Sequence, residues 1–288
     1  MHCFKSHPVC PLPASIEILP SQIPTSDQLR TLLSAGTHVY LTDIGTPAVN
    51  SEMLVAAQRL RDVGCNPVPH LAARRIRSRE ALEKCIKEFA ELAGVNNVLV
   101  VGGGIATPLG PYKSTMDILE TGFLDRFGIQ DIAVAGHPEG SPDFTEALAI
   151  EALRQKQAFA ERTGARLRIV TQFCFDPARA LAWAASLAKV GVDLPVHIGV
   201  AGPAKFATLI RYATLCGVGN SLSMLTRSAG NIMSLATGYS PETFVSQIEK
   251  ELATLARPTI SQMHIFPFGG LENASSWLAG GDPGKPTS

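Results

Sequence analysis

Short runs of apolar residues alternate along the chain with longer segments in which apolar residues recur at helical spacing. Nearly every helical segment ends in a glycine just before the next apolar run. A glycine at that place caps a helix in the left-handed conformation and returns the chain to the sheet. The expected strands lie at 15–20, 38–43, 66–73, 97–103, 131–138, 168–173, 195–202 and 263–268. The expected helices lie at 26–36, 51–64, 78–94, 114–128, 142–164, 177–191, 204–217 and 221–256, the last broken near 238–241.

The strands are apolar almost throughout, which indicates a parallel sheet buried on both faces. Eight such strands, most of them followed by a helix, predict an α/β fold with a single (β/α)8 TIM barrel. A doubly wound Rossmann sheet would need about six strands and a G-x-G-x-x-G motif that opens a helix. The glycines at 102–104 do not complete that motif. We expect an irregular segment over 1–14, one barrel over 15–279 and a flexible tail over 280–288.

The composition excludes some classes of binding partner and indicates the compartment in which the protein acts. The 288 residues carry 25 Lys and Arg against 25 Asp and Glu, so no charge excess indicates nucleic acid or an acidic membrane surface. Charged residues make up 17% of the chain, and this low charge favours a homo-oligomer. The chain has no apolar run of about 18 residues and no secretory signal near its start. We therefore expect a cytoplasmic protein with no membrane span.

The cysteines argue against a zinc ribbon or a thioredoxin-type site, because none of the six has C-x-x-C spacing. His2, Cys3, His7 and Cys10 contain metal-ligating atoms near the start of the chain. Reduced thiols in an irregular segment are the better interpretation there. No metal is expected.

Polar residues at the carboxyl ends of the strands are the candidates for chemistry, because barrel enzymes build their sites there. They are Glu17, Thr42, Asp43, His70, the glycines at 102–104, His137, Glu139, Thr171, Gln172, His197 and His264. Glu17 lies between Ile16 and Ile18, and apolar surroundings favour a neutral carboxyl group. We expect a raised pKa for Glu17, which suits a general acid. The alternative is a carboxylate paired inside the barrel with an arginine or backbone donors.

Several of these residues have a structural interpretation beside the functional one. His70 is a catalyst or a hydrogen-bonding anchor. The glycines at 102–104 allow a phosphate or flavin to approach, or they form a tight turn. Gln172 pairs with the edge of a heterocycle, or it closes the barrel rim. The arginines at 74, 75, 77 and 79 hold a phosphate or form a solvated loop, and the solvated loop is the commoner case.

Five segments of the chain resemble the methylenetetrahydrofolate reductase family of FAD-containing (β/α)8 barrels. The segment 135–143, AGHPEGSPD, is similar to the family's A-G-Y-P-E-G-H-P-E. The segments 171–176, TQFCFD, and 16–20, IEILP, are similar to T-Q-F-F-F-D and F-E-F-F-P. The shorter segments 69–71, PHL, and 263–266, MHIF, are similar to P-H-L and L-H-F-Y.

The resemblance implies a flavoprotein that interconverts 5,10-methylenetetrahydrofolate and 5-methyltetrahydrofolate, with NAD(P)H as the nicotinamide partner. It places Glu17 where the family has the general acid that assists opening of the folate's five-membered ring. It implies folate contacts for Gln172, Gly104 and Phe206. It implies FAD contacts for Thr42, His70, Gly103, Gly104, Thr115, His137, Glu139 and Lys156.

The departures from the family's pattern change the expected direction of the reaction. The family reads R-G-D at the end of strand four, so Gly104 replaces an Asp near the flavin. A negative charge there disfavours the anionic reduced flavin, and its loss should raise the flavin's potential. We therefore expect ready oxidation of 5-methyltetrahydrofolate and poor use of NAD(P)H. Thr208 and Gly270 also replace a family Gln and Arg.

Two alternative functions belong to other classes. One is a flavin-free, pterin-binding methyltransferase barrel. The other is a barrel that binds flavin or folate without catalysis, and the glycine at position 104 favours it while the presence of Glu17 opposes it.

Overall fold

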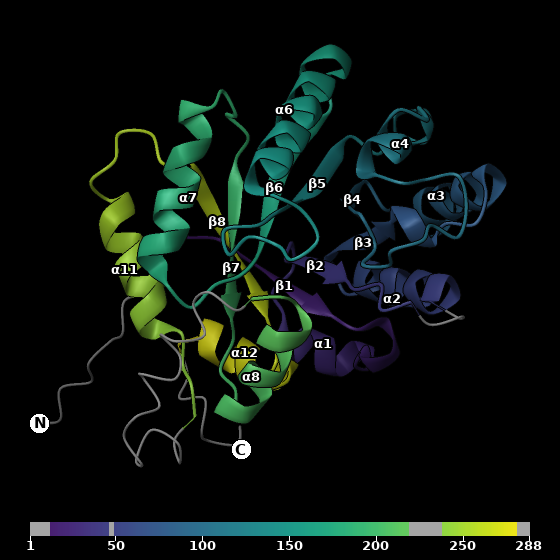
Figure 1. Cartoon of the computed structure of the whole chain (residues 1–288). Coiled ribbons are helices and arrows are strands. Elements are labelled where there is room, and N and C mark those ends of the chain that lie inside the picture. The colour runs from purple at the N-terminus through teal and green to yellow at the C-terminus, as the bar shows by residue number, and fades with distance from the viewer. Residues whose placement is uncertain (1–11, 46–48, 219–237, 281–288) are drawn as a thin grey trace, which may run out of the picture.

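The computed structural model describes residues 12–45, 49–218 and 238–280, and its eight parallel strands close into a barrel in chain order (Figure 1). This confirms the predicted (β/α)8 architecture. The strands are β1 (Ala14–Ile18), β2 (His38–Leu41), β3 (Asn66–Ala72), β4 (Asn97–Val101), β5 (Asp131–Gly136), β6 (Arg166–Phe173), β7 (Val196–Ala201) and β8 (Ile260–Phe266). Pairing of Ile16 with Ile265 joins β1 to β8 and closes the ring.

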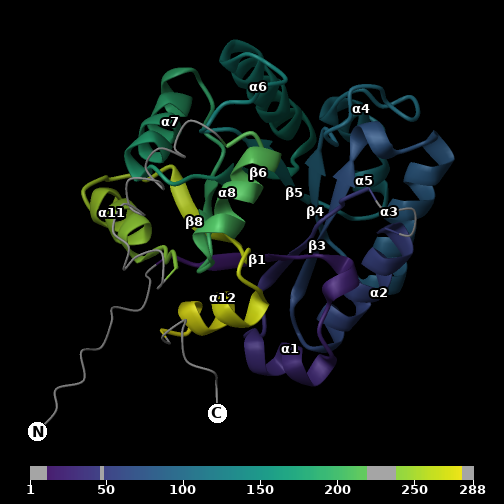
Figure 2. The ribbon, with the colours of Figure 1, turned by 60° about the horizontal axis from the view of Figure 1, so that its bottom comes forward.

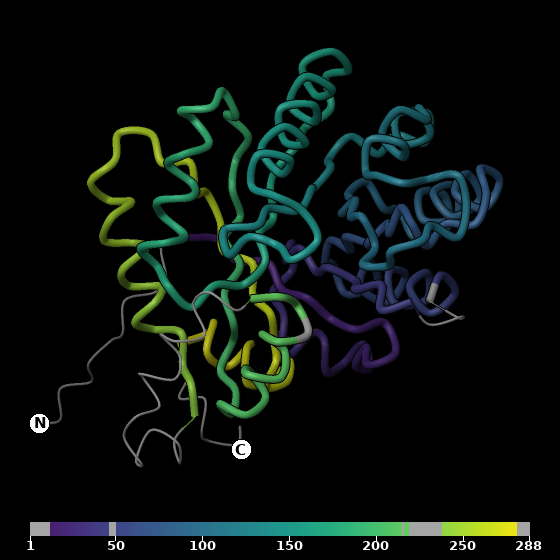
Figure 3. The backbone as a smooth tube through the Cα atoms, in the orientation of Figure 1, coloured from purple at the N-terminus to yellow at the C-terminus, as the bar shows by residue number. Residues whose placement is uncertain are grey.

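Helices surround the strands on the outside, and the chain passes once around the barrel from purple to yellow (Figures 2 and 3). They are α1 (Ser26–Leu32), α2 (Val49–Asp62), α3 (Arg79–Ala93), α4 (Thr115–Leu119), α5 (Phe123–Arg126), α6 (Glu146–Thr163), α7 (Pro177–Lys189), α8 (Phe206–Leu215), α11 (Glu242–Leu252) and α12 (Leu271–Leu278). Short 3-10 turns, η1 (Pro20–Gln22) and η2 (Ala73–Arg75), follow β1 and β3.

Local signals in the sequence explain where these helices begin and end. The side chain of Ser78 accepts a hydrogen bond from the backbone of Ala81 at the start of α3. Asp176 does the same for Ala178 and Arg179 at the start of α7. Gly94 ends α3 in the left-handed conformation, with φ of 57°, as the glycine rule predicts.

Two predicted helices differ from those observed. The segment predicted as one helix over 114–128 forms α4 and α5, because Gly122 adopts a φ of 73° and interrupts the helical path. The helix predicted from 142 begins at Glu146, because Thr145 caps it by accepting from the backbone of Leu148. Much of the segment predicted over 221–256 lies outside the described residues, and α11 is its described part.

The core has two parts that the strand alternation keeps separate. Ile16, Val39 and their counterparts on other strands face outward and pack against the helices. Tyr40, Val68, Leu99, Ala133 and Val170 face inward and fill the middle of the barrel. Thr42 and His70 follow Tyr40 and Val68 by two residues, so they take the next inward positions toward the carboxyl ends of β2 and β3. Glu17 faces inward near the end of β1. Apolar side chains therefore fill most of the layer beneath the candidate site, where Arg168 reaches the Tyr40 hydroxyl, and the mouth of the barrel is polar.

Candidate active site

Glu17 is the centre of a polar cluster that four strands build at the mouth of the barrel. The hydroxyl of Thr42 donates a hydrogen bond of 2.5 Å to Glu17 Oε1. His70 Nε2 lies 3.7 Å from Oε1, and His264 Nε2 lies 3.5 Å from Oε2. These partners come from the end of β2, from β3 and from β8. The sequence predicted all four as strand-end candidates but gave His264 no role.

The prediction of a raised pKa for Glu17 is wrong. Burial raises the pKa of this carboxyl group, but the hydrogen bond from His264, the charges of His70 and His264, and the hydrogen bond from Thr42 together lower it further. The net effect is a pKa below the ordinary value. The reason is that the apolar neighbours in the sequence point away from the barrel axis, so the surroundings of the carboxylate are polar. Glu17 is a paired carboxylate, although its partners are histidines rather than an arginine.

His264 is held from its other side by Ser15. Ser15 Oγ lies 3.0 Å from His264 Nδ1 and 3.2 Å from the carbonyl oxygen of Met263. A hydroxyl that donates to this carbonyl accepts a hydrogen bond from Nδ1–H. With Nδ1–H held in this way, a neutral ring turns its Nε2 lone pair toward Glu17, and a charged ring donates from Nε2–H to the carboxylate. Ser15 and His264 are buried, and the Glu17 side chain is only 12% exposed, so the pair Glu17–His264 is arranged to share one proton.

His70 offers a nitrogen to a ligand. Its Nε2 is buried and, within the described part of the chain, has no hydrogen-bond partner. Burial lowers the pKa of His70 most, with a smaller contribution in the same direction from His264, against the raising effect of Glu17. A neutral imidazole at the mouth of the barrel is therefore available to donate or accept a hydrogen bond.

Gln172 is positioned by an irregularity in β6. The register between β6 and β7 shifts between Val170 and Phe173, and the Thr171 hydroxyl fills the gap by accepting from Gly199 N at 2.8 Å. A Cβ atom at Gly199 would lie 2.4 Å from the carbonyl oxygen of Gln172, so only glycine fits there. Gln172 Nε2 donates to Gly140 O at 3.2 Å. This bond closes the rim between β5 and β6, as the structural interpretation of the sequence predicted.

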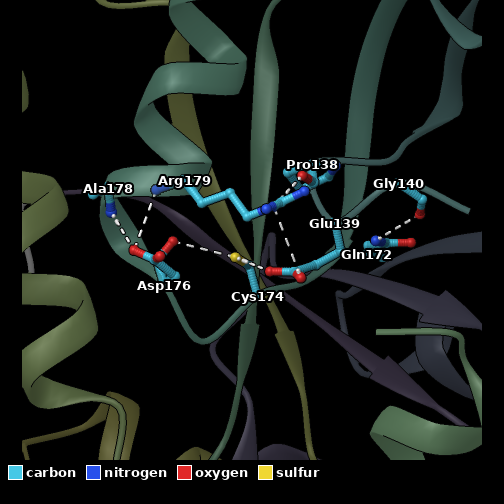
Figure 4. A network of polar contacts seen from close by, with 8 residues as sticks. All are labelled: Pro138, Glu139, Gly140, Gln172, Cys174, Asp176, Ala178 and Arg179. Carbon is cyan, nitrogen blue, oxygen red and sulfur yellow. Dashed lines mark hydrogen bonds and ion pairs between the residues drawn. The ribbon is translucent and has the colours of Figure 1, made fainter. Parts of the chain in front are cut away.

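The buried carboxylate of Glu139 anchors the turn after β5 (Figure 4). Cys174 Sγ donates to Glu139 Oε1 at 2.7 Å, and Arg179 Nε lies 3.9 Å from Glu139 Oε2. Arg179 Nε also donates to Pro138 O at 3.0 Å. The predicted contact of Glu139 with FAD stays a prediction, because the observed partners of this carboxylate are protein groups. Its observed effect is to fix the turn that carries His137 and Gly140.

Lys156 and His137 form a basic site beside that turn. Lys156 lies on α6 and is only 7% exposed. Within the described residues it has no hydrogen bond or ion pair. Burial lowers the pKa of Lys156 to about 8. Burial, with a smaller contribution from Lys156, lowers the pKa of His137 to about 4. A buried amine without a counter-ion among the described residues fits a phosphate group.

The loop after β4 supplies open backbone at the mouth. Gly103 and Gly104 have φ of 106° and 62°, and a Cβ atom at Gly104 would meet no atom within 4 Å. The loop is held by Arg74, which donates to Ile105 O at 3.1 Å and Lys113 O at 3.0 Å. Arg75 pairs with Asp43 at 2.9 Å. These two arginines therefore organise loops, and neither interpretation of the basic run describes them.

Two further predicted contacts lie at the edge of this site. Thr115 is the first residue of α4, which follows the glycine loop. Phe206 begins α8 and is only 7% exposed, and its ring packs against Tyr239 with centroids 6.4 Å apart. It belongs to an aromatic cluster with Phe173 and Phe175 at the ends of β6 and β7. Their contacts with a cofactor or substrate stay predictions.

Sequence reasoning missed Ser15, Tyr40 and Cys174, and it treated Arg168 only as the start of a strand. Ser15 and Tyr40 each precede a predicted site residue by two positions, so strand alternation places them on the same inward face. That spacing was the available signal. Cys174 and Arg168 do not precede a predicted site residue by two positions, so this spacing does not identify them.

Two features are absent from the described part of the chain, a membrane-crossing helix and a metal site. No helix there is long and apolar enough to cross a membrane. No group of three His, Cys, Asp or Glu side chains there is arranged to hold a metal ion. The segment with His2, Cys3, His7 and Cys10 lies outside the described residues.

Comparison with known proteins places the chain in a family. Among solved structures, the chain is similar to dihydropteroate synthase from Thermus thermophilus in complex with 6HMPPP. The identity is 11%, the match covers 93% of this chain and 92% of that chain, and the TM-score is 0.44. A family model for methylenetetrahydrofolate reductase matches residues 27–268, a range that begins after Glu17. This match spans most of the sequence, and the chain belongs to the methylenetetrahydrofolate reductase family.

Proposed function

We propose that this chain is an FAD-dependent oxidoreductase that interconverts 5,10-methylenetetrahydrofolate and 5-methyltetrahydrofolate, and that it favours oxidation of the methyl form. Family membership supports the folate chemistry. The observation that carries the proposal is the carboxylate of Glu17, only 12% exposed and paired with Thr42, His70 and His264 at the barrel mouth.

The residues present fit the cofactor that the family implies. The buried amine of Lys156, which has no partner among the described residues, and the neighbouring His137 suit its phosphates, and the backbone at Gly104 is open to close approach. Thr42, His70 and Thr115 complete the proposed set. When bound, FAD supplies an acceptor and donor of hydride.

The protein's own chemistry concerns the proton on N10 of the folate. Loss of hydride from the N5-methyl group leaves a methylene iminium ion. The N10 amine then attacks the methylene carbon, which closes the five-membered ring and releases the N10 proton. The Glu17 carboxylate accepts this proton as a general base. In the opposite direction Glu17–H returns the proton to N10, and the ring opens.

The lowered pKa of Glu17 supports the oxidative direction. Ring closure needs the carboxylate, and a carboxyl group with a pKa below its ordinary value is ionised at neutral pH. N10 is an aryl amine, whose protonated form is strongly acidic, so a weak base is sufficient. The reductive direction needs the protonated acid, which is scarce at the same pH.

His264, held by Ser15, accepts the proton from Glu17. With Nδ1–H held by Ser15, the Nε2 of His264 receives the proton from Glu17 and regenerates the carboxylate. The resulting imidazolium donates to both Ser15 and Glu17. This returns Glu17 to the form that the next ring closure requires.

Gly104 supports the same direction on electrostatic grounds. The family's pattern has a carboxylate at this position, and here no side chain is present. Without that negative charge, a negatively charged reduced cofactor is less disfavoured. Oxidation of 5-methyltetrahydrofolate gains from this change, and reduction of 5,10-methylenetetrahydrofolate loses.

The test compares the purified chain with Glu17→Gln and with Glu91→Gln, a control on the exposed face of α3. A yellow protein with the absorption of FAD supports a flavoprotein, and a colourless protein that still binds methyltetrahydrofolate supports a methyltransferase barrel. Glu17→Gln should keep FAD and lose methyltetrahydrofolate oxidation by about 100-fold or more. Equal turnover in both variants would mean that Glu17 is not the proton acceptor.

A further inference from the structure

Tyr40 lies directly below the Glu17 cluster and contacts both of its histidines. It is fully buried on β2, and its Cα pairs with that of Glu17 in the register between β1 and β2. The ring centroid of Tyr40 lies 4.5 Å from that of His264, at an interplanar angle of 65°. The centroid of His70 lies 6.3 Å away, at 77°. One aromatic ring therefore supports the two imidazoles that flank the carboxylate.

The phenol of Tyr40 is held from the opposite side of the barrel. Arg168 on β6 donates from Nε to the Tyr40 hydroxyl at 3.1 Å, and its guanidinium carbon lies 5.8 Å from the ring centroid. The bond joins residues 128 positions apart in the sequence. It crosses the interior in the layer below the candidate site, where apolar side chains otherwise fill the barrel.

Arg168 is a cation without a carboxylate of its own. The nearby Asp131 is engaged by Arg166, at 2.8 and 2.6 Å. Arg168 Nη2 is buried and has no hydrogen-bond partner among the described residues. The Tyr40 hydroxyl is the partner that the structure assigns to this guanidinium, so the interaction is costly to lose from either side.

The groups that act on this pair come from most of the surrounding strands. They are Glu17 on β1, His38 on β2, His70 on β3, Asp131 on β5, His197 on β7 and His264 on β8. At the mouth, Asp43 acts on His70, and Cys216 lies within range of the charge of Glu17. Arg168 on β6 is the arginine in this set.

We propose that Tyr40 and Arg168 are positioning residues for the proton-transfer cluster: Arg168 fixes the phenol, and the phenol ring holds His264 and His70 against Glu17. This inference rests on the proposed function for its effect on turnover, but not for its effect on the histidines. Tyr40 supports the groups that move the proton, and it is not itself among the residues assigned to cofactor or substrate.

The test uses the full chain with the variants Tyr40→Phe and Arg168→Met. Tyr40→Phe keeps the ring and removes the hydroxyl, and Arg168→Met removes both the bond and the cation. The matched control is Tyr112→Phe, because Tyr112 is buried outside the site and its hydroxyl has no described hydrogen-bond partner. Two quantities are measured for each: the pH titration of the imidazole nitrogens by NMR after labelling of histidine with 15N, and the pH profile of methyltetrahydrofolate oxidation.

We expect Tyr40→Phe to change the titration midpoint of His70 by about half a pH unit or more, and to shift the imidazole 15N signals of His264. Arg168→Met should disturb the same imidazoles, because the phenol loses the donor that fixes it. Oxidation should fall by about tenfold in both variants, and Tyr112→Phe should match the unaltered chain.

Imidazole titrations within about 0.1 pH unit of the unaltered chain in both Tyr40→Phe and Arg168→Met would overturn the inference. If the unaltered chain does not oxidise methyltetrahydrofolate, the proposed function fails, and the titrations still decide the roles of Tyr40 and Arg168. If Arg168→Met does not fold, Tyr40→Phe alone gives the decision.

Discussion

Thr42 donates a hydrogen bond of 2.5 Å to Glu17 from the neighbouring strand, and this bond favours the ionised carboxylate. A hydrogen bond to a charged group contributes about 1.5–3 kcal/mol. Thr42→Val keeps the shape of the side chain and removes this donor. The pKa of Glu17 should then rise by about one unit or more.

The pH profile of methyltetrahydrofolate oxidation measures this change. The base form of Glu17 is lost as the pH falls through its pKa, so a raised pKa moves the acidic limb of the profile to higher pH. Thr254→Val, at the end of α11, is the control, because the hydroxyl there bonds only to a nearby carbonyl. An acidic limb that is unchanged in Thr42→Val would contradict a role for this bond.

The lowered pKa of Lys156 predicts that FAD affinity depends on pH. The amine is charged below about pH 8 in the free protein, and a bound phosphate favours the charged form. As the pH rises above 8, binding must also take up a proton, so the Kd should increase by up to about tenfold per pH unit. Equilibrium titration of the apoprotein with FAD between pH 7 and about pH 10 measures this slope.

Two variants separate charge from packing at this position. Lys156→Met should weaken FAD binding at pH 7 and abolish the slope. Lys156→Arg should also abolish the slope, because a guanidinium stays charged throughout this range. A Kd that rises equally with pH in all three proteins would assign the dependence to another group.

Gly104 can be tested by restoring the carboxylate that the family's pattern has there. Its φ of 62° is one that Asp and Asn tolerate better than other side chains, and a Cβ atom there meets no neighbour within 4 Å. Gly104→Asn is the matched control, since it shares the backbone cost and carries no charge. We expect Gly104→Asp to be reduced about tenfold more slowly by 5-methyltetrahydrofolate than Gly104→Asn, through a lower flavin potential.

The fold was predictable from the sequence because its signals are local. Apolar strands, polar caps such as Ser78 and terminal glycines such as Gly94 recur along the chain and need no knowledge of distant residues. The break at Gly122 was harder to predict, because a glycine inside a helical pattern is often tolerated.

The site was predictable in position but not in its electrostatics. Strand-end residues were identified because all parallel strands end at one face of the barrel. The ionisation of Glu17 depends on Thr42, His70 and His264, which reach it through the register of separate strands. The residues adjacent to Glu17 in the sequence are apolar and point outward, so reasoning from them gave the wrong sign for the pKa. Lys156 and Arg168 show the same limit, because their lack of a carboxylate partner is visible only in three dimensions.

Anaerobic reduction of the bound flavin tests the central claim most directly. The purified chain is mixed without oxygen with 5-methyltetrahydrofolate in one experiment and with NADH in another, and the loss of visible flavin absorbance is followed. The account predicts rapid bleaching by 5-methyltetrahydrofolate and little or no bleaching by NADH. In Glu17→Gln, bleaching by 5-methyltetrahydrofolate should be much slower than in the unaltered chain. Rapid bleaching by NADH with none by 5-methyltetrahydrofolate would contradict it.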